Sequence, residues 1–258
     1  MKELLNTMRA LRHPETGCDW DKKQSFESIA PYTIEEAYEV AEAIRTNDMA
    51  SLRDELGDLL LQVVFHSQIA EEQGSFQFTD VVKAVNDKMI RRHPHVFEGV
   101  VYADEDAQKQ AWEEIKASER SKNQADPSVL ADLPHALPAL MRSEKIQKRV
   151  ASVGFDWPSV EPVFDKIAEE IGELKAEVAL GDKNQKAIEE EYGDLMFVVV
   201  NLAKHLKIDP EKALRNANIK FENRFRKLEQ AIEKKGNDIS SSTLDEMEAV
   251  WQDIKKAE

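Results

Sequence analysis

Residues 161–206 read EPVFDKIAEEIGELKAEVALGDKNQKAIEEEYGDLMFVVVNLAKHL, and this stretch decides the fold. Its apolar residues recur at steps of three and four, the spacing of one face of an α-helix. One face holds Phe164, Ile167, Ile171, Leu174 and Val178, and a second holds Ile188, Tyr192, Leu195, Val199, Leu202 and Leu206. Because the loop between them is short, we expect two antiparallel helices whose axes lie about 8–10 Å apart.

The same spacing continues over most of the chain. No stretch shows sustained apolar and polar alternation, and no Asn-Gly or Asp-Gly turn joins two β-branched runs. Nine Gly and nine Pro in 258 residues also favour helix. We therefore predict an all-α fold with helices at about 2–12, 32–46, 50–73, 78–92, 103–121, 139–151, 161–180, 184–206, 210–235 and 243–256.

The two halves of the chain repeat the same motifs in the same order. Glu-Glu-x-x-Glu begins at Glu35 and again at Glu169, and Glu-x-Gly-Asp begins at Glu55 and again at Glu191. Further along, Asn86, Lys88, Arg92, Trp112 and Lys116 correspond to Asn218, Lys220, Arg224, Trp251 and Lys255. A proline-containing stretch separates the halves. We predict a tandem duplication with an N-terminal domain at 1–122, a linker at 123–138 and a C-terminal domain at 139–258.

The repeated acidic motifs indicate a metal site. Carboxylates three or four residues apart share one helix face, and two such faces on packed helices repel unless they are neutralised. Oxygen ligands suit Mg²⁺, with Mn²⁺ as an alternative. A single Glu-rich face is typical of a solvated helix, but its repetition favours metal binding. Gly57 and Gly193, each just before the Asp, indicate close helix approach or room for a ligand. The predicted ligands are Glu170, Glu173, Glu191 and Asp194, with a second, less certain site at Glu36, Glu39, Glu55 and Asp58.

The repeated cations point to phosphate. Lys220 and Arg224 share one helix face on an otherwise acidic protein, and Arg and Lys are the usual phosphate-binding side chains. A surface face with ordinary ion pairs is the competing interpretation. Asn218 would add a hydrogen bond, while Trp251 with Lys255 would stack a base and contact a phosphate. The first copy offers Lys88, Arg92 and Trp112.

Composition excludes several classes of protein. The formal net charge of −15 argues against a nucleic acid polymer as partner. Cys18 is the single cysteine, so an intramolecular disulfide and a four-cysteine zinc site are impossible. No apolar run reaches the roughly 20 residues that span a membrane, and the first residues lack the apolar core of a secretory signal. We expect a soluble, cytoplasmic protein.

Several motifs together resemble the MazG family of the all-α NTP pyrophosphatases, over nearly the whole chain. They are Gly17-Cys-x-Trp20-Asp21-x-x-Gln24, Tyr32-Thr-x-Glu35-Glu36-x-Tyr38-Glu39, Leu52-x-x-Glu55-Leu-Gly-Asp58, Arg91-Arg-His-Pro-His-Val-Phe97 and Val153-Gly-Phe-Asp-Trp157. The resemblance implies Mg²⁺-dependent hydrolysis of NTPs and dNTPs to the monophosphate and pyrophosphate. It also implies an intertwined homodimer of helical bundles, and favours the C-terminal domain as the catalytic one.

The resemblance also implies a set of site residues. Four acids would bind metal, and nucleotide contacts would fall on Lys166, Glu169, Lys220, Arg224 and Trp251. We predict as catalytic Glu169, Glu170, Glu173, Glu191, Asp194, Lys220 and Arg224, and as substrate-binding Lys166, Glu169, Glu190, Asn218, Lys220, Arg224, Trp251 and Lys255. Lys166 has no cationic counterpart in the first copy, where Pro31-Tyr32-Thr33 precedes the acids. The general base stays open between Glu169 and the metal-binding acids.

Other functions stay open at this point. A related enzyme acting on one modified nucleotide would keep the metal site but show steep base selectivity. A non-enzymatic dimerisation or regulatory module, with a basic protein or a signalling nucleotide as partner, would bind nucleotide without turnover. A ferritin-like di-iron protein is disfavoured because its Glu-x-x-His pairs are absent from the sequence.

Overall fold

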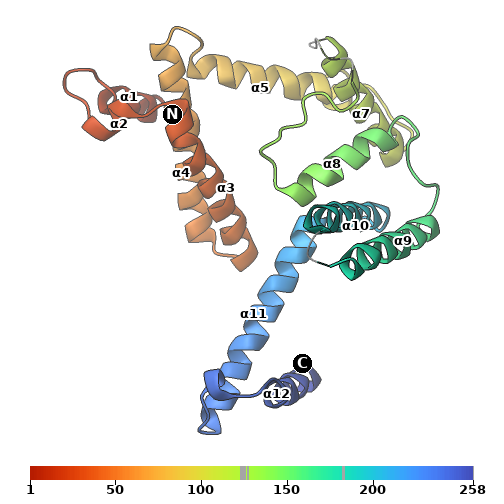
Figure 1. The fold of residues 1–258 in the computed structure, drawn as a ribbon. Coiled ribbons are helices and arrows are strands. Elements are labelled where there is room, and N and C mark those ends of the chain that lie inside the picture. Colours follow the sequence, from red (N-terminus) through yellow and green to blue (C-terminus); the bar gives the residue numbers. More distant parts are fainter. Residues whose placement is uncertain (123–125, 127, 182–183, 258) are drawn as a thin grey trace. The chain divides into compact units, whose positions relative to one another are not determined.

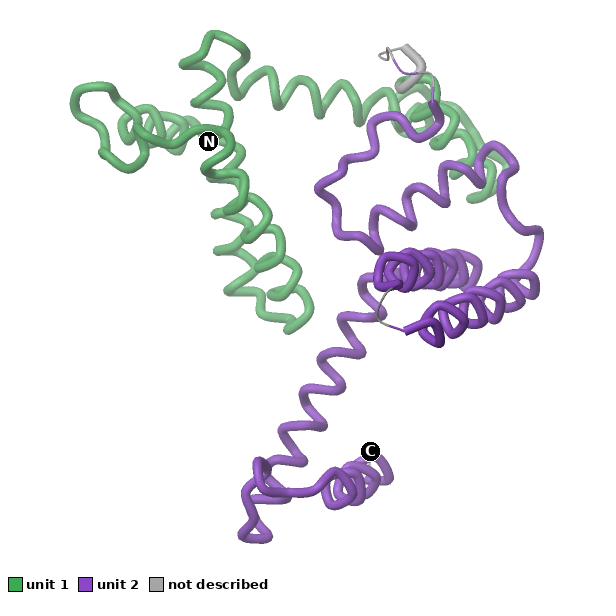
Figure 2. Tube along the Cα trace, in the orientation of Figure 1, with its two compact units in different colours: residues 1–119 green, residues 120–258 purple. Residues whose placement is uncertain are grey.

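The computed structural model describes residues 1–122, 126, 128–181 and 184–257, and every secondary-structure element among them is helical (Figure 1). This confirms the predicted all-α class. The helices form two compact units, residues 1–119 and 120–258 (Figure 2). Residues 123–125 and 127 of the predicted linker lie outside the described residues. No helix in the described part of the chain is long and apolar enough to cross a membrane.

Unit 1, residues 1–119, is organised around two long helices that pack side by side. Its elements are α1 (Lys2–Leu11), α2 (Asp19–Lys23), α3 (Phe26–Thr46), α4 (Met49–Glu72), α5 (Phe78–Arg92), α6 (Pro94–Phe97) and most of α7 (Glu105–Lys122). Helix α3 packs along α4, and α1 packs on α4. The core between them contains Met8, Ile29, Val64, Phe65 and Ile69. The hairpin α3–α4 carries the first acidic motif.

One predicted boundary in unit 1 was wrong, and two short helices were not predicted. Helix α3 begins at Phe26 rather than near residue 32, because Ser25 and Ser28 form a capping box and the helix continues through Pro31. Helix α2 was not predicted, since five residues are too few to show a period. Between the predicted helices at 78–92 and 103–121 the structure adds α6, where Pro94 takes the first helical position that proline favours.

Unit 2 repeats the helical hairpin. Its elements are α8 (Ala139–Ala151), α9 (Glu161–Ala179), α10 (Gln185–His205), α11 (Pro210–Lys234), η2 (Ile239–Ser241) and α12 (Leu244–Ala257). Helices α9 and α10 pack along each other, as predicted, and α8 packs on α10. Helix α11 leads away from the α9–α10 pair, and α12 packs against α11 (Figure 1). Leu228, Ile232 and Val250 are buried between α11 and α12.

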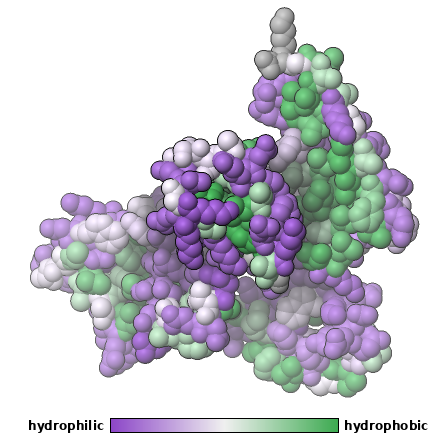
Figure 3. Space-filling model, turned by 90° about the horizontal axis from the view of Figure 1, so that it is seen from below, coloured by the Kyte–Doolittle hydropathy of each residue, from purple (hydrophilic) through white to green (hydrophobic). Residues whose placement is uncertain are grey.

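Only part of each predicted apolar face is buried within the chain. Phe164 and Val178 on α9 are 53% and 55% exposed, and Tyr192 on α10 is 57% exposed. Green apolar residues accordingly lie at the surface among hydrophilic ones in Figure 3. The physical reason is that a hairpin of two helices covers one side of each helix, while these faces are wide enough to contact more than one neighbour.

Candidate metal and nucleotide site

Three carboxylates meet between α9 and α10 in unit 2. Glu170 on α9 and Glu191 and Asp194 on α10 each offer an oxygen, and these oxygens lie within 4.8 Å of one another. Glu170 is buried at 4% exposure, Glu191 is half-buried, and Asp194 is exposed. Glu191 and Asp194 lie three residues apart, so one turn of α10 presents both to α9. The fourth predicted ligand, Glu173, lies outside this group.

The carboxylates of this group repel one another, and a cation would relieve that repulsion. Burial raises the pKa of Glu191, and the nearby charges of Glu173, Glu170 and Asp194 raise it further. Lys166, one turn before Glu170, places its Nζ 2.7 Å from Glu169 Oε1 and 2.8 Å from Glu170 Oε1. These contacts raise the pKa of Lys166, so it stays charged beside the acids.

The donor set fits a hard divalent cation. All three clustered ligands are carboxylates, which Mg²⁺ and Mn²⁺ prefer. A Cβ added at Gly57 or Gly193 would meet nothing within 4 Å in the described chain. Close approach of two helices within one chain therefore does not explain Gly57 and Gly193. The other explanation, room for a ligand beside the acids, remains.

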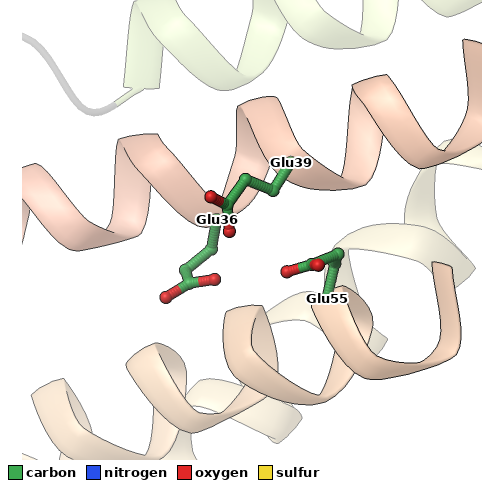
Figure 4. Close-up of side chains that lie close together, drawn as sticks. All are labelled: Glu36, Glu39 and Glu55. Carbon is green, nitrogen blue, oxygen red and sulfur yellow. The ribbon is translucent and has the colours of Figure 1, made fainter. Parts of the chain in front are cut away.

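Unit 1 carries a second group of the same kind. Glu36 and Glu39 come from α3 and Glu55 from α4, and their oxygens also lie within 4.8 Å of one another (Figure 4). Burial raises the pKa of Glu55, and Glu39 contributes through its charge and a hydrogen bond. Asp58, predicted as the fourth ligand, lies outside this group but still raises the pKa of Glu36, after burial. The two groups share two corresponding positions, Glu36 with Glu170 and Glu55 with Glu191, but the third member is Glu39 in unit 1 and Asp194 in unit 2.

The predicted phosphate-binding residues of unit 2 lie on other helices. Asn218, Lys220 and Arg224 are on α11, and Trp251 and Lys255 are on α12. Trp251 packs against Phe221, with ring centroids 5.2 Å apart. Because α11 leads away from the α9–α10 hairpin, the structure does not bring this set to the acids of the same chain (Figure 1). Glu190 precedes Glu191 on α10, and its Oε1 lies 3.4 Å from Lys186 Nζ.

Two of the corresponding residues of unit 1, Arg92 and Trp112, contact neighbouring side chains. Arg92 and Arg91 both bind Glu119, at 2.7 and 2.6 Å. Trp112 contacts the His93 ring edge-on, with centroids 4.6 Å apart. Lys88 is half-buried on α5. A phosphate at Arg92 would have to displace the Glu119 carboxylate.

One polar cluster beside α10 was not predicted. Asp156 forms an ion pair with Lys204, lies 3.3 Å from His205 Nε2, and accepts a hydrogen bond from Asn201. Burial raises the pKa of Asp156, but the bonds from Lys204 and Asn201 outweigh this and leave it lowered. The Gly154-Phe-Asp-Trp157 motif marked this segment, whereas uncharged Asn201 carried no signal in the sequence.

Comparison with known proteins identifies the family. The model of the MazG nucleotide pyrophosphohydrolase domain matches twice, at residues 24–97 and 159–228. The chain belongs to the MazG family. Both matches contain an acidic group and a pair of cations, Lys88 and Arg92 in the first and Lys220 and Arg224 in the second.

Relatives match over the full length. The nucleoside triphosphate pyrophosphohydrolase of Escherichia coli K12 is 50% identical over 99% of this chain and 97% of its own. The nucleoside triphosphate pyrophosphohydrolase/pyrophosphatase MazG of Thermotoga maritima is 44% identical over 98% of this chain and 95% of its own. The MazG repeat expected from the motifs is therefore confirmed.

Proposed function

We propose that this protein hydrolyses nucleoside triphosphates, both NTPs and dNTPs, to the monophosphate and pyrophosphate. The carboxylate group of Glu170, Glu191 and Asp194 carries the proposal, because it lies inside a matched MazG domain of a chain whose full-length relatives are named for this activity. A cytoplasmic location, where free nucleotides are found, remains our prediction.

We assign the principal site to unit 2. Lys166 lies beside the acids there, whereas Pro31-Tyr32-Thr33 occupies the corresponding stretch of unit 1. A cation at this place attracts the triphosphate, which the net acidic surface otherwise repels. Unit 1 keeps its acids and is proposed as a weaker or structural copy.

Glu170, Glu173, Glu191 and Asp194 are proposed to hold Mg²⁺, with Mn²⁺ as the alternative. When bound, such an ion lowers the pKa of a water molecule and neutralises phosphate charge. Glu169, exposed next to Glu170, is placed to accept a proton from the attacking water. Lys220 and Arg224 are proposed to bind the departing pyrophosphate and stabilise its developing charge.

A homodimer is proposed from the uncovered apolar faces. Phe164, Ile171 and Val178 recur every seven residues on α9 and are all exposed. Tyr192 and Val199 on α10, with Leu206 at its C-cap, do the same. A second copy of the hairpin would cover these stripes, as one helix pair covers another in a four-helix bundle.

Product analysis tests the activity. Purified protein is incubated with Mg²⁺ and each of a panel of NTPs and dNTPs, and the products are separated by ion exchange. Monophosphate and pyrophosphate in equal amounts, abolished by EDTA, are expected. Diphosphate and phosphate, or equal turnover in EDTA, would refute the proposal. Tight nucleotide binding without turnover would support a regulatory module instead.

A further inference from the structure

Two arginines at the end of α5 converge on one carboxylate of α7. Arg91 Nε lies 2.6 Å from Glu119 Oε1, and Arg92 Nη2 lies 2.7 Å from Glu119 Oε2. Arg92 Nε also donates to Oε2, at 3.0 Å, so both oxygens of Glu119 are bound. Paired guanidinium groups hold a phosphate group in the same way, and here a carboxylate takes its place.

The cluster holds more positive than negative charge. Arg91 and Arg92 carry two positive charges against the one charge of the carboxylate between them. Lys88 lies one turn before Arg92 on the same helix face and adds a third cation. Asp87, another acid near Arg91, is paired with Lys83 at 2.5 Å. An anion with several charges can therefore compete with the tethered carboxylate.

The contact between Arg92 and Glu119 is sheltered from water. Their side chains are 22% and 19% exposed, whereas that of Arg91 is 54% exposed. Hydrogen bonds from Arg92 and Arg91 lower the pKa of Glu119 although burial opposes them, so the carboxylate stays ionised at neutral pH. Arg91 thus offers an entry from solvent to a contact that salt screens only weakly.

Helix α7 is held to unit 1 mainly by side-chain contacts. Helices α1, α3 and α5 each pack on α4, whereas α7 has no extensive packing contact with a described helix of unit 1. The large apolar side chains of residues 105–119 are Trp112 and Ile115, and Trp112 contacts the His93 ring. Loss of the Glu119 contact would therefore release the end of α7 at little cost in buried apolar area.

We propose that Arg91 and Arg92 form an anion site that Glu119 fills in the free protein, and that a phosphate chain displaces Glu119 and releases the end of α7. The ligand class is an anion with adjoining phosphates, either pyrophosphate or the chain of a nucleotide, because it offers several oxygens to the guanidinium groups. The site is separate from the acidic group of unit 1, which lies on α3 and α4. Unit 2 has Asn223 at the position that corresponds to Arg91, so it does not repeat the arginine pair.

Calorimetry with pyrophosphate tests the anion site. Titrations use EDTA and the full chain carrying Lys220→Met and Arg224→Met, so that the proposed phosphate-binding residues of unit 2 do not contribute. Adding Glu119→Gln should tighten binding about tenfold or more, because the competing charge is removed. Glu113→Gln is the matched control, since it removes the same charge from α7, where Glu113 pairs with Lys116. Titration with ATP instead of pyrophosphate separates the two sources of the phosphate chain.

The gain in affinity must depend on the arginines. Arg91→Met and Arg92→Met, added to the Glu119→Gln chain, should abolish it. A gain that survives these changes, or an equal gain in Glu113→Gln, overturns the site. No gain in Glu119→Gln also overturns it, because the contact is then an ordinary ion pair. These titrations involve no turnover, so their result is independent of the proposed hydrolysis.

Hydrogen exchange tests the release of α7. Saturating pyrophosphate in EDTA should speed amide exchange at residues 113–119 of the wild type and leave residues 49–72 of α4 unchanged. Glu119→Gln should show the same faster exchange without pyrophosphate, because the contact is weakened in advance. Unchanged exchange at residues 113–119 in both experiments overturns the release of α7.

Discussion

Glu191 is the acid of the unit 2 group that is repelled by carboxylates on both α9 and α10. Its carboxylate is half-buried and faces Glu170 and Asp194, so its raised pKa records repulsion that the described residues do not fully neutralise. Glu55 occupies the same place in unit 1, and burial and neighbouring carboxylates raise its pKa as well. Both units bring mutually repelling carboxylates together, and this repulsion supports the proposal that the group in unit 2 binds a divalent cation.

Lys166 provides a test at this scale. Lys166→Met removes the cation that contacts Glu169 and Glu170, so the acids should bind Mg²⁺ more tightly in the absence of nucleotide. The same change should raise KM for the triphosphate about tenfold, because a charge-assisted contact is lost. Isothermal titration measures the first effect, and pyrophosphate release the second. Lys175→Met, at an exposed position on the same helix, should change neither; equal effects in the two variants would show a general charge effect.

The sequence predicted the acids but not the polar cluster around Asp156, for a physical reason. Carboxylates three and four residues apart on two packed helices must meet, so the helical period alone brings Glu170 near Glu191. Asp156, in the segment after α8, meets Asn201 of α10 only through tertiary packing such as that of α8 on α10. Such a contact depends on packing that no local pattern encodes.

Helices α1 and α4 are joined by a buried cation. The side chain of Arg12 is 6% exposed, its Nη2 lies 2.7 Å from Glu72 Oε2, and its guanidinium lies 5.3 Å from the centre of the Phe65 ring. Nη1 also donates to the backbone oxygens of Asp21 and Gln24, which holds α2 against the hairpin. Arg12 therefore positions the whole segment that precedes α3.

This ion pair makes the stability of unit 1 depend on pH. The hydrogen bonds from Arg12 lower the pKa of Glu72 below its usual 4.5, so folding favours its ionised form. The stabilisation is complete above the unfolded-state pKa and is lost as pH falls through the lower folded-state pKa. At neutral pH, Glu72→Gln should cost about 1–2 kcal/mol, allowing for the partial exposure of Glu72.

Thermal unfolding from pH 7 to pH 3 measures this effect. The Tm of Glu72→Gln should fall less steeply below pH 5 than the wild-type Tm, so the two curves converge in acid. Glu71→Gln is the control, since its partner Arg9 is 50% exposed and the pair contributes little. A constant Tm difference across the range would contradict the account.

Long helices were predicted more accurately than short ones. Helices α8 and α5 match their predicted bounds because each shows several turns of apolar periodicity. Helices α2 and α6 have five and four residues, and their formation depends on caps and on neighbouring helices. Helix α3 begins six residues before its predicted start because the Ser25 cap starts it at Phe26 and it continues through Pro31, a residue that usually interrupts a helix.

At the scale of the molecule, the exposed apolar stripes predict self-association. Phe164→Glu places a charge in the α9 stripe at a position that is 53% exposed in the single chain. The variant should keep its helicity but sediment as a monomer where the wild type sediments as a dimer. Val101→Glu, at 89% exposure in unit 1, should leave the dimer intact. A monomeric wild type would contradict the proposed homodimer.

The central claim is that the acidic group of unit 2 performs the hydrolysis, and a matched pair of variants tests it most directly. Glu191→Gln and Glu55→Gln remove equivalent carboxylates from the two repeats and should leave both proteins folded. The measurement is the rate of Mg²⁺-dependent pyrophosphate release at saturating triphosphate. The account predicts a loss of about 10²-fold or more for Glu191→Gln, the scale of a catalytic group, and near wild-type rates for Glu55→Gln. Full activity in Glu191→Gln, or the reverse order of the two variants, would contradict it.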